Sequence, residues 1–349
     1  NMNNKKFFRI NLIYFIAMIL VASIFVLGYA GILTNDFVTS FLIQIVIMFA
    51  IPMLMYTALI SKNFKKTFSD AGFKKISLKM VGIAILLGIV LYCINDFVAS
   101  AFASFISLLG YENISTSTTV TFNYGLLLKD FILSCVLPGF CEEFLHRGIM
   151  LHAGKNCANT RFVLISSSIL FGLIHLNINQ FFYACILGFL MGYVSLASNS
   201  IFPAMIIHFM NNFLSSYFYY GYYLNWPLAN FIYSIESALL SNIFIYVIVS
   251  TLFIIAMIFL YFYLTRLIAK ERVRYEVLRI IDCLRLEKIP IEEAQQKINQ
   301  TNEILEKTRI FNIKDRENKK ISFVSIIFLI SSIVLGSLIT ISSFIWGII

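Results

Sequence analysis

Charged residues are scarce in this sequence. Only 13% of its 349 residues are Asp, Glu, Lys or Arg, whereas 59% are hydrophobic. The mean hydropathy is strongly positive. This composition argues against an ordinary soluble domain and is typical of a multi-pass membrane protein.

The motifs of several common sites are also missing. The six cysteines lack the paired spacing of a zinc ribbon or of a secreted disulfide framework, so we expect reduced thiols. They are Cys93, Cys135, Cys141, Cys157, Cys185 and Cys283. The chain has no H-E-x-x-H zinc motif and no Ser–Lys dyad that can be placed within a membrane span. Its basic loops lack an interleaved stacking platform, so the net charge of +9 does not indicate nucleic acid as a partner.

Long apolar runs are abundant instead. A run of about 20 residues crosses the roughly 30 Å of hydrocarbon in a bilayer. The first run lacks a small-residue cleavage site, and we therefore expect a retained span. Segment 226–240 is too short and interrupted for a confident span, and a re-entrant or interfacial helix is the alternative. The apolar runs lie at 10–32, 37–60, 80–108, 124–153, 160–177, 180–197, 200–219, 241–267 and 321–347.

These runs predict an all-α polytopic membrane protein with about nine transmembrane helices. We divide the chain into five parts. They are 1–79, with two spans and a basic inner-surface segment; 80–220, the candidate catalytic core; 221–267, with the re-entrant or interfacial segment and the eighth span; 268–320, a helical hairpin; and 321–349, the last span.

The positive charges indicate an orientation. Loops on the cytoplasmic side of a membrane are enriched in Lys and Arg. With the N-terminus inside, every Lys and Arg except Lys129 falls on the inner side. We therefore expect a cytoplasmic N-terminus and an outer C-terminus in a bacterial cell membrane, with anionic membrane lipids as partners.

One long stretch is polar. Charged residues dominate between Lys270 and Lys320, and apolar residues recur at helical spacing on both sides of Pro290. This pattern predicts a cytoplasmic helical hairpin. Two interpretations stay open, a solvated linker and a docking module for a protein partner.

The segment "GFCEEFLHRG" at 139–148 places charged residues inside an apolar run. Glu143 and Arg147 are four positions apart, so on a helix they share a face and can form a structural ion pair. Glu142 lies about 100° away around the helix and lacks that partner. Ionisable residues within a membrane span indicate a functional site by default.

Two later spans carry polar residues at compatible depths. Folding the chain back at the polar turn 155–160 brings His175 level with Glu142, and His208 and Asn212 share one face of a later span. These four residues are therefore the candidate catalytic site. Each also has a structural alternative, because a buried His or Asn often only joins two helices.

The remaining polar residues of the spans receive other interpretations. His146 and His152 lie nearer the inner surface and are expected to be solvated. Asp96 and Asp130 lack motif context. We expect these two acids to be structural or to line a polar cavity.

The motifs resemble those of the CPBP family of intramembrane proteases, also called the Abi family, which includes the type II CAAX prenyl endopeptidases. The resemblance rests on "EEFLHR" (142–147), "FGLIH" (171–175) and "HFMNN" (208–212), in the family's order and on separate spans. It covers 80–220 and gives no role to 268–320.

The resemblance implies an intramembrane endopeptidase that uses a Glu-activated water. Glu142 would be the general base and His175 would hold or polarise the water. His208 and Asn212 would donate hydrogen bonds to the oxyanion. The implied substrate is a peptide or membrane-protein segment, with a prenylated CAAX tail, a peptide pheromone and a bacteriocin leader as open alternatives.

Other readings of the same residues stay open. Glu142, His175 and His208 can supply the ligands of a catalytic zinc. We expect no metal cofactor, because Asn212 suits an oxyanion donor and no carboxylate is placed to orient either histidine. A non-proteolytic scaffold or bacteriocin-immunity factor of the same fold is the alternative function. A proton-coupled transporter ranks last, since no inverted repeat is detected.

Overall fold

The protein is built from helices. The computed structural model describes residues 2–112, 124–286, 288–307 and 321–347, and these ranges contain helices and no strand. This confirms the all-α polytopic fold class. In chain order the helices are α1 (Met2–Tyr29), α2 (Asp36–Phe41), η1 (Leu42–Ala50), α3 (Ile51–Tyr56), η2 (Thr57–Ser61), α4 (Phe64–Asp70), α5 (Leu78–Leu108), α6 (Tyr124–Asp130), η3 (Phe131–Val136), α7 (Leu137–Glu143), η4 (Phe144–Ala153), η5 (Gly154–Asn156), α8 (Thr160–Leu173), α9 (Ile178–Ser198), α10 (Phe202–Tyr223), α11 (Pro227–Leu240), α12 (Ile243–Arg285), α13 (Ile291–Lys307) and α14 (Phe323–Trp346).

Seven helical stretches in the described residues are long and apolar enough to cross a membrane. Two of them combine several of the labelled elements into one continuous helix, Asp36–Ser61 from α2 to η2 and Tyr124–Asn156 from α6 to η5. The other five are α1, α5, α9, α12 and α14. Each of the seven coincides with one of the apolar runs in the sequence.

The two other predicted spans differ from these seven. The sequence predicts a helix through residue 177, but α8 has only 14 residues and ends at Leu173. The chain then turns, with Leu176 in the left-handed region at φ 52°, before α9 begins. The expected full-length span is therefore wrong, because hydropathy does not reveal a turn inside an apolar run. Helix α10 has 22 residues but is not among the seven stretches.

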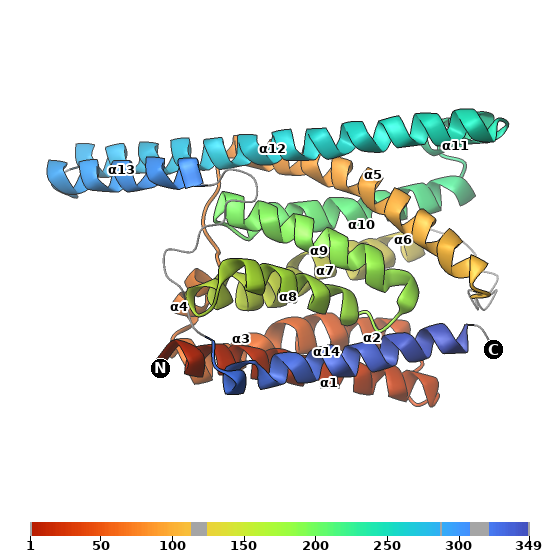
Figure 1. Ribbon diagram of the computed structural model, residues 1–349, viewed down its shortest axis with the longest axis horizontal. Coiled ribbons are helices and arrows are strands. Elements are labelled where there is room, and N and C mark those ends of the chain that lie inside the picture. Colours follow the sequence, from red (N-terminus) through yellow and green to blue (C-terminus); the bar gives the residue numbers. More distant parts are fainter. Residues whose placement is uncertain (1, 113–123, 287, 308–320, 348–349) are drawn as a thin grey trace.

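The helices lie roughly along the long axis of the molecule (Figure 1). Helices α1 and α14 pack together along one edge, and α5 and α12 pack together along the opposite edge. Between them lie α7, α8, α9 and α10. One hydrophobic cluster joins α1, η4, α8 and α14, and a second joins α5, α9, α10 and α12. The polar residues of the candidate site line a cavity with Phe171, Ala184 and Leu187 of the second cluster.

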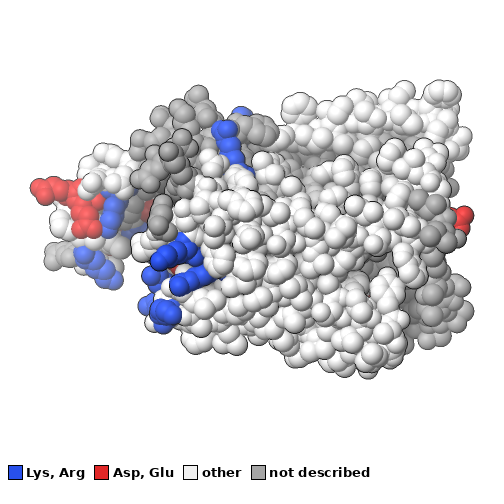
Figure 2. Space-filling model, turned by 60° about the horizontal axis from the view of Figure 1, so that its bottom comes forward, with Lys and Arg blue, Asp and Glu red and all other residues white. Residues whose placement is uncertain are grey.

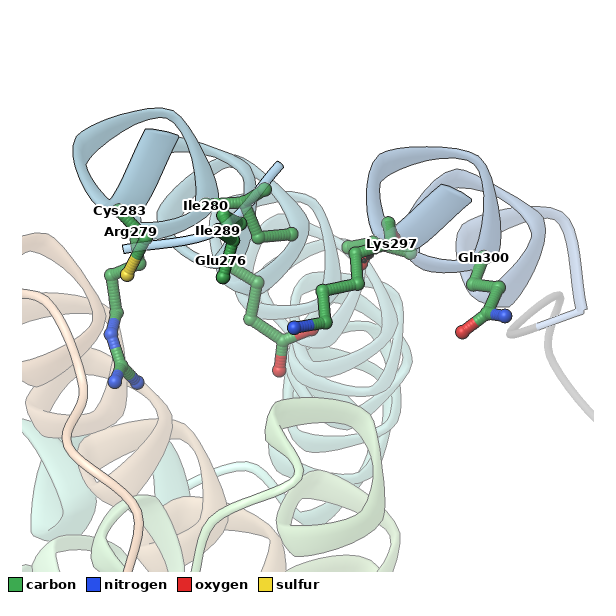
Figure 3. A pocket seen from close by; sticks show the side chains of 8 residues that line it. Glu276, Arg279, Ile280, Cys283, Ile289, Lys297 and Gln300 are labelled. Carbon is green, nitrogen blue, oxygen red and sulfur yellow. Dashed lines mark hydrogen bonds between the residues drawn. The ribbon is translucent and has the colours of Figure 1, made fainter. Parts of the chain in front are cut away.

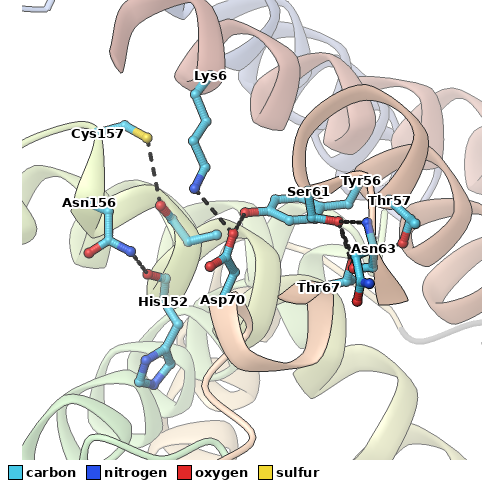
Figure 4. Close-up of polar contacts among 11 residues, drawn as sticks. Lys6, Tyr56, Thr57, Ser61, Asn63, Thr67, Asp70, His152, Asn156 and Cys157 are labelled. Carbon is cyan, nitrogen blue, oxygen red and sulfur yellow. Dashed lines mark hydrogen bonds and ion pairs between the residues drawn. The ribbon is translucent and has the colours of Figure 1, made fainter. Parts of the chain in front are cut away.

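Polar contacts fix the short helix α4 against the first two spans (Figure 4). The Asp70 carboxylate accepts a hydrogen bond of 2.8 Å from the Tyr56 hydroxyl and pairs with the Lys6 ammonium at 3.4 Å. The Ser61 and Thr67 hydroxyls lie 2.6 Å apart. These contacts therefore hold the basic segment, which is predicted for the inner surface, against the helical bundle.

Helix α12 is much longer than a bilayer is thick. Its 43 residues span about 65 Å at the helical rise, whereas the hydrocarbon core measures about 30 Å. Its C-terminal part projects beyond the bundle, and α13 folds back beside it (Figure 1). A cavity of ≈ 350 Å³ lies between them, lined in part by Glu276, Ile280 and Lys297 (Figure 3). The predicted helices on either side of Pro290 are present up to Lys307, and residues 308–320 of the predicted hairpin lie outside the described residues.

Charged side chains gather at the end of the molecule that carries α13, called the hairpin end below (Figure 2). The middle of the face visible in Figure 2 shows no Lys, Arg, Asp or Glu among the described residues. A belt without charge flanked by charge is what a protein surrounded by lipid requires.

Candidate active site

The "EEFLHR" motif lies in the middle of the long helix Tyr124–Asn156. Within that helix, α7 is flanked by the π-helical segments η3 and η4, and π-helical segments are frequent at functional sites. Pro138 occupies the first turn of α7. A Cβ atom on Gly139 would lie only 3.2 Å from the Phe209 side chain and 3.3 Å from the Met205 carbonyl. Gly139 therefore lets α7 approach the backbone of α10 closely.

The four candidate catalytic residues line one cavity of ≈ 440 Å³. Glu142 comes from α7, His175 from the turn between α8 and α9, and His208 and Asn212 from α10. Glu142 is 8% exposed and His208 is 4% exposed. The structure thus brings together the residues that the sequence selects from three separate segments.

Glu142 has one partner that the sequence analysis missed. The Gln44 amide donates a 2.7 Å hydrogen bond to Glu142 Oε1. Glu142 Oε2 is buried and has no hydrogen-bond partner among the described residues. In the sequence, Gln44 is an isolated amide within an apolar run. This isolation is the feature that could have identified it as a site residue. One carboxylate oxygen is therefore held, and the other is left for a water or a substrate.

The predicted ion pair is present and extends to the site. Arg147 Nη1 lies 2.7 Å from Glu143 Oε1, and both side chains are almost fully buried. The same oxygen lies 2.8 Å from His208 Nδ1, and Arg147 Nη2 donates to the Gly188 carbonyl at 3.2 Å. The expectation that no carboxylate orients His208 is therefore wrong. It failed because this contact joins two helices 65 positions apart in the chain.

Both site histidines are held through the same ring nitrogen. His175 Nδ1 lies 2.8 Å from the Phe171 carbonyl, which can only accept a hydrogen bond. His208 Nδ1 faces the Glu143 carboxylate, which also accepts. Nδ1 therefore carries the proton in both rings, and Nε2 is the nitrogen left to meet a water or a substrate.

Phe171, the first residue of the "FGLIH" motif, packs the charged and imidazole groups together. The Arg147 guanidinium lies 4.2 Å from the centre of its ring. The ring also meets His146, His175 and His208 edge to face, at centroid distances of 5.0, 5.3 and 5.7 Å. These contacts explain the phenylalanine in the motif, because its ring packs against four neighbouring side chains and fixes their positions.

The expectation that His146 and His152 are solvated is wrong. His146 is 0% exposed and His152 is 2% exposed. His146 Nε2 lies 3.0 Å from the Tyr14 hydroxyl, and its Nδ1 lies 2.8 Å from the Glu142 carbonyl. His152 Nε2 lies 2.9 Å from the Ser195 hydroxyl. All of η4 is buried, because other helices surround this segment, and helical spacing alone does not show that.

Asn212 is held by two polar neighbours. Its amide nitrogen donates to the Ser134 carbonyl at 2.9 Å, and its oxygen accepts from Asn211 at 3.1 Å. One amide N–H is left beyond that bond. Asp130 accepts a 2.6 Å hydrogen bond from Tyr220 and lines a neighbouring cavity, and Asp96 is exposed on α5.

The cysteines and the possible metal ligands remain to be placed. No disulfide joins any of the six cysteines, as the sequence predicts. In the part of the chain that the structure describes, no three His, Cys, Asp or Glu side chains are grouped closely enough to hold a metal ion. Glu142, His175 and His208 thus share a cavity without forming a set of ligands.

Residues 124–214 match the family model of the Type II CAAX prenyl endopeptidase Rce1-like proteins. The matched segment contains all three motifs and all four candidate catalytic residues, and this confirms the resemblance. The match supports an intramembrane protease of the CAAX-protease type. The comparison with curated proteins and the comparison with solved structures give no match.

Proposed function

Because residues 124–214 match the Rce1-like proteins, we propose that this protein is an intramembrane endopeptidase in which Glu142 activates the attacking water. One observation carries the proposal. Glu142 Oε2 is buried without a hydrogen-bond partner among the described residues, and Glu142 lines a cavity together with His175, His208 and Asn212. A carboxylate with one unsatisfied oxygen, in a residue that lines a polar cavity, suits a general base.

The proton positions assign different tasks to the two histidines. With Nδ1 protonated, neutral His175 presents the Nε2 lone pair, which accepts a hydrogen bond from the water and helps to hold it. His208 can donate from Nε2 only when both ring nitrogens carry a proton, and the Glu143 carboxylate, which also pairs with Arg147, accepts the Nδ1–H at 2.8 Å. An imidazolium is a strong donor to an oxyanion.

The reaction then follows in two proton transfers. Glu142 takes a proton from the water as its oxygen bonds to the carbonyl carbon of the peptide. His208 and the remaining N–H of Asn212 stabilise the oxyanion of the tetrahedral intermediate. As the C–N bond breaks, Glu142 returns its proton to the leaving amine, so the products are a carboxylic acid and an amine, and the acid then loses its proton to the surrounding water.

The substrate in this proposal is a peptide or a membrane-protein segment. A prenylated CAAX tail, a pheromone precursor and a bacteriocin leader all contain a bond that such a site can hydrolyse. Segment 268–320 is then a candidate docking site for a protein partner, since none of its described residues lines the cavity.

The test compares the wild type with Glu142→Gln in proteoliposomes that contain a tagged membrane-peptide substrate. Glutamine keeps the shape and the contact with Gln44 but cannot accept the proton of water. We expect turnover to disappear while the melting temperature is unchanged. Cleavage at the wild-type rate by Glu142→Gln would contradict the proposal and leave a scaffold as the better interpretation.

Metal dependence needs a separate measurement. We propose a metal-independent reaction, so dialysis against a strong chelator should leave the rate unchanged. Elemental analysis of the purified protein is the companion measurement. Stoichiometric zinc, with activity lost to chelation and restored by zinc, would assign His175 and His208 as ligands.

A further inference from the structure

The candidate catalytic cavity extends from Glu142 in one direction along the bundle. In the long helix 124–156, its lining includes Leu133, Ser134 and Pro138, which precede Glu142, and none of the residues of η4, which follow it. In α10, which begins near the hairpin end (Figure 1), the lining runs from His208 to Ser216. Both helices therefore place the cavity on the side of Glu142 away from the hairpin end.

Toward the hairpin end the cavity is closed by packed side chains. Phe171 and Arg147 are each 2% exposed, His146 is 0% exposed and Tyr14 is 1% exposed. They are joined by the ring contacts and hydrogen bonds described above. A peptide that entered through this wall would have to disrupt these contacts.

Away from the hairpin end a second cavity adjoins the first. This second cavity, of ≈ 310 Å³, shares Ser40, Leu133 and Ser134 with the first. Its other lining residues include Asp36, Lys129 and Asp130. Charged side chains in a membrane protein concentrate where water is present. The shared lining residues therefore place this polar cavity beside the one that contains Glu142.

The order of polarity along the two cavities supports a path to Glu142. Glu142 is buried at its inner limit, Asn212 is partly buried, and Ser134 and Ser215 are exposed. Ser40 sits one helical turn before Gln44, the partner of Glu142, and four residues after Asp36. A polar peptide that enters along this path can therefore replace its hydrogen bonds to water with hydrogen bonds to hydroxyl, amide and carboxylate groups of the lining.

We propose that the scissile peptide reaches Glu142 from the end opposite the hairpin end, which we call the far end, through the two adjoining cavities. The inference rests on the proposed function for its catalytic meaning. Since the cations predict that the hairpin end is cytoplasmic, the substrate is a polar, extended segment on the extracytoplasmic side. Such a substrate is an exported peptide or the outer flank of a membrane protein, and a lipidated cytoplasmic tail does not fit.

The test labels single added cysteines from one side of sealed vesicles. Ser40→Cys and Ser134→Cys place a thiol where the two cavities meet. The activity of each variant is measured before and after labelling, and the two values are compared. A membrane-impermeant methanethiosulfonate is added to right-side-out or to inside-out vesicles. Mass spectrometry measures labelling, and native Cys283, on the hairpin part of α12, reports which side the hairpin faces.

We expect the reagent to label Ser40→Cys and Ser134→Cys only from the side opposite Cys283, and labelling to abolish cleavage. The controls are the wild type and Ser107→Cys, an exposed position near the far end of α5. Both should keep their activity after the same treatment. This pattern would support access from the far end.

Several results would overturn the inference. These are labelling only from the side of Cys283, no labelling from either side, or full cleavage by a protein whose added thiol is quantitatively labelled. Labelling is read without catalysis, so it still locates the route if Glu142→Gln has refuted the peptidase. A failure of the proposed function and a failure of the route are therefore distinguishable.

Discussion

At the scale of single residues, the site depends on hydrogen bonds that fix charged groups. Glu142 is held by Gln44, and Glu143 holds both Arg147 and His208. Adjacent glutamates thus have different surroundings, because successive helical residues point about 100° apart. One is exposed to the cavity and the other is enclosed.

Gln44→Leu should slow catalysis. The substitution removes the amide that holds Glu142 Oε1, and a hydrogen bond to a charged group contributes about 1.5–3 kcal/mol. We expect kcat to fall by about tenfold or more, with KM nearly unchanged, because Gln44 acts through Glu142 rather than on the substrate. Steady-state kinetics in proteoliposomes measure both constants.

The matched control is Gln295→Leu, an exposed glutamine on α13. It should match the wild type. A Gln44→Leu enzyme that changes KM alone would show that Gln44 contacts the substrate instead of positioning Glu142.

Arg147→Ala should harm folding more than chemistry. It leaves Glu143 buried without its cation and removes the contacts with Gly188 and Phe171. Breaking a buried pair costs about 3–5 kcal/mol, so folded yield and melting temperature in detergent should both fall. Arg147→Lys keeps the charge and should lose less. A stable, well-folded Arg147→Ala protein without activity would contradict this assignment.

At the scale of helices, the site requires α7 and α10 to lie close together. Gly139→Ala should push these helices apart, because its Cβ would lie 3.2–3.3 Å from Phe209 and from the Met205 carbonyl. We expect lower activity together with a lower melting temperature.

Gly82→Ala on α5 provides the comparison, since nothing lies within 4 Å of its Cβ position. It should be neutral or stabilising, because alanine favours a helix by about 0.5–1 kcal/mol over glycine. Equal melting temperatures and equal activities for the two variants would refute tight packing at Gly139.

The hairpin can be removed only in part. Arg272 donates to the Ala197 carbonyl at 3.4 Å, and Glu271 accepts from Ser77 at 3.1 Å. Replacing 278–318 with a flexible linker should therefore keep basal cleavage and alter substrate choice. Replacing 270–318 should also lower stability, because it cuts into the contacts with the core.

Cleavage of a model membrane peptide and melting temperature are measured for both deletions. Complete loss of catalysis by a folded 278–318 deletion would place the hairpin in the active unit. Equal stability of the two deletions would show that the Arg272 and Glu271 contacts contribute little.

At the scale of the whole molecule, the charged side chains gather at one end and the candidate catalytic cavity extends toward the opposite end. Most of the charged side chains visible in Figure 2 lie at the hairpin end, whereas the candidate catalytic cavity extends toward the far end. We propose on this basis that lipid headgroups and partners are bound at one end and that the substrate enters at the other.

The predicted topology places the hairpin in the cytoplasm. Asn299→Cys on exposed α13 should react with an impermeant thiol reagent in inside-out vesicles and not in intact cells. Comparison with wild type corrects for native Cys283. Labelling of the added thiol in intact cells would reverse the orientation and, with it, the side assigned to the substrate.

The sequence by itself determined the class of the protein. Apolar runs long enough for a bilayer predicted the helices, and the three motifs selected the residues that meet in the cavity. These features follow from local periodicity and hydropathy, which each segment carries alone. The spacing of Glu143 and Arg147 also predicted their pair, because both lie on one helix.

Only the tertiary structure decided the contacts between distant segments. It supplied Gln44 as the partner of Glu142, turned the same carboxylate of Glu143 toward His208, buried His146 and ended α8 at Leu173. The periodicity of one segment contains no information about which residue of another segment will pack against it. The direction in which the candidate cavity extends depends on the packing of several helices at once, and for that physical reason it could not be read from the sequence.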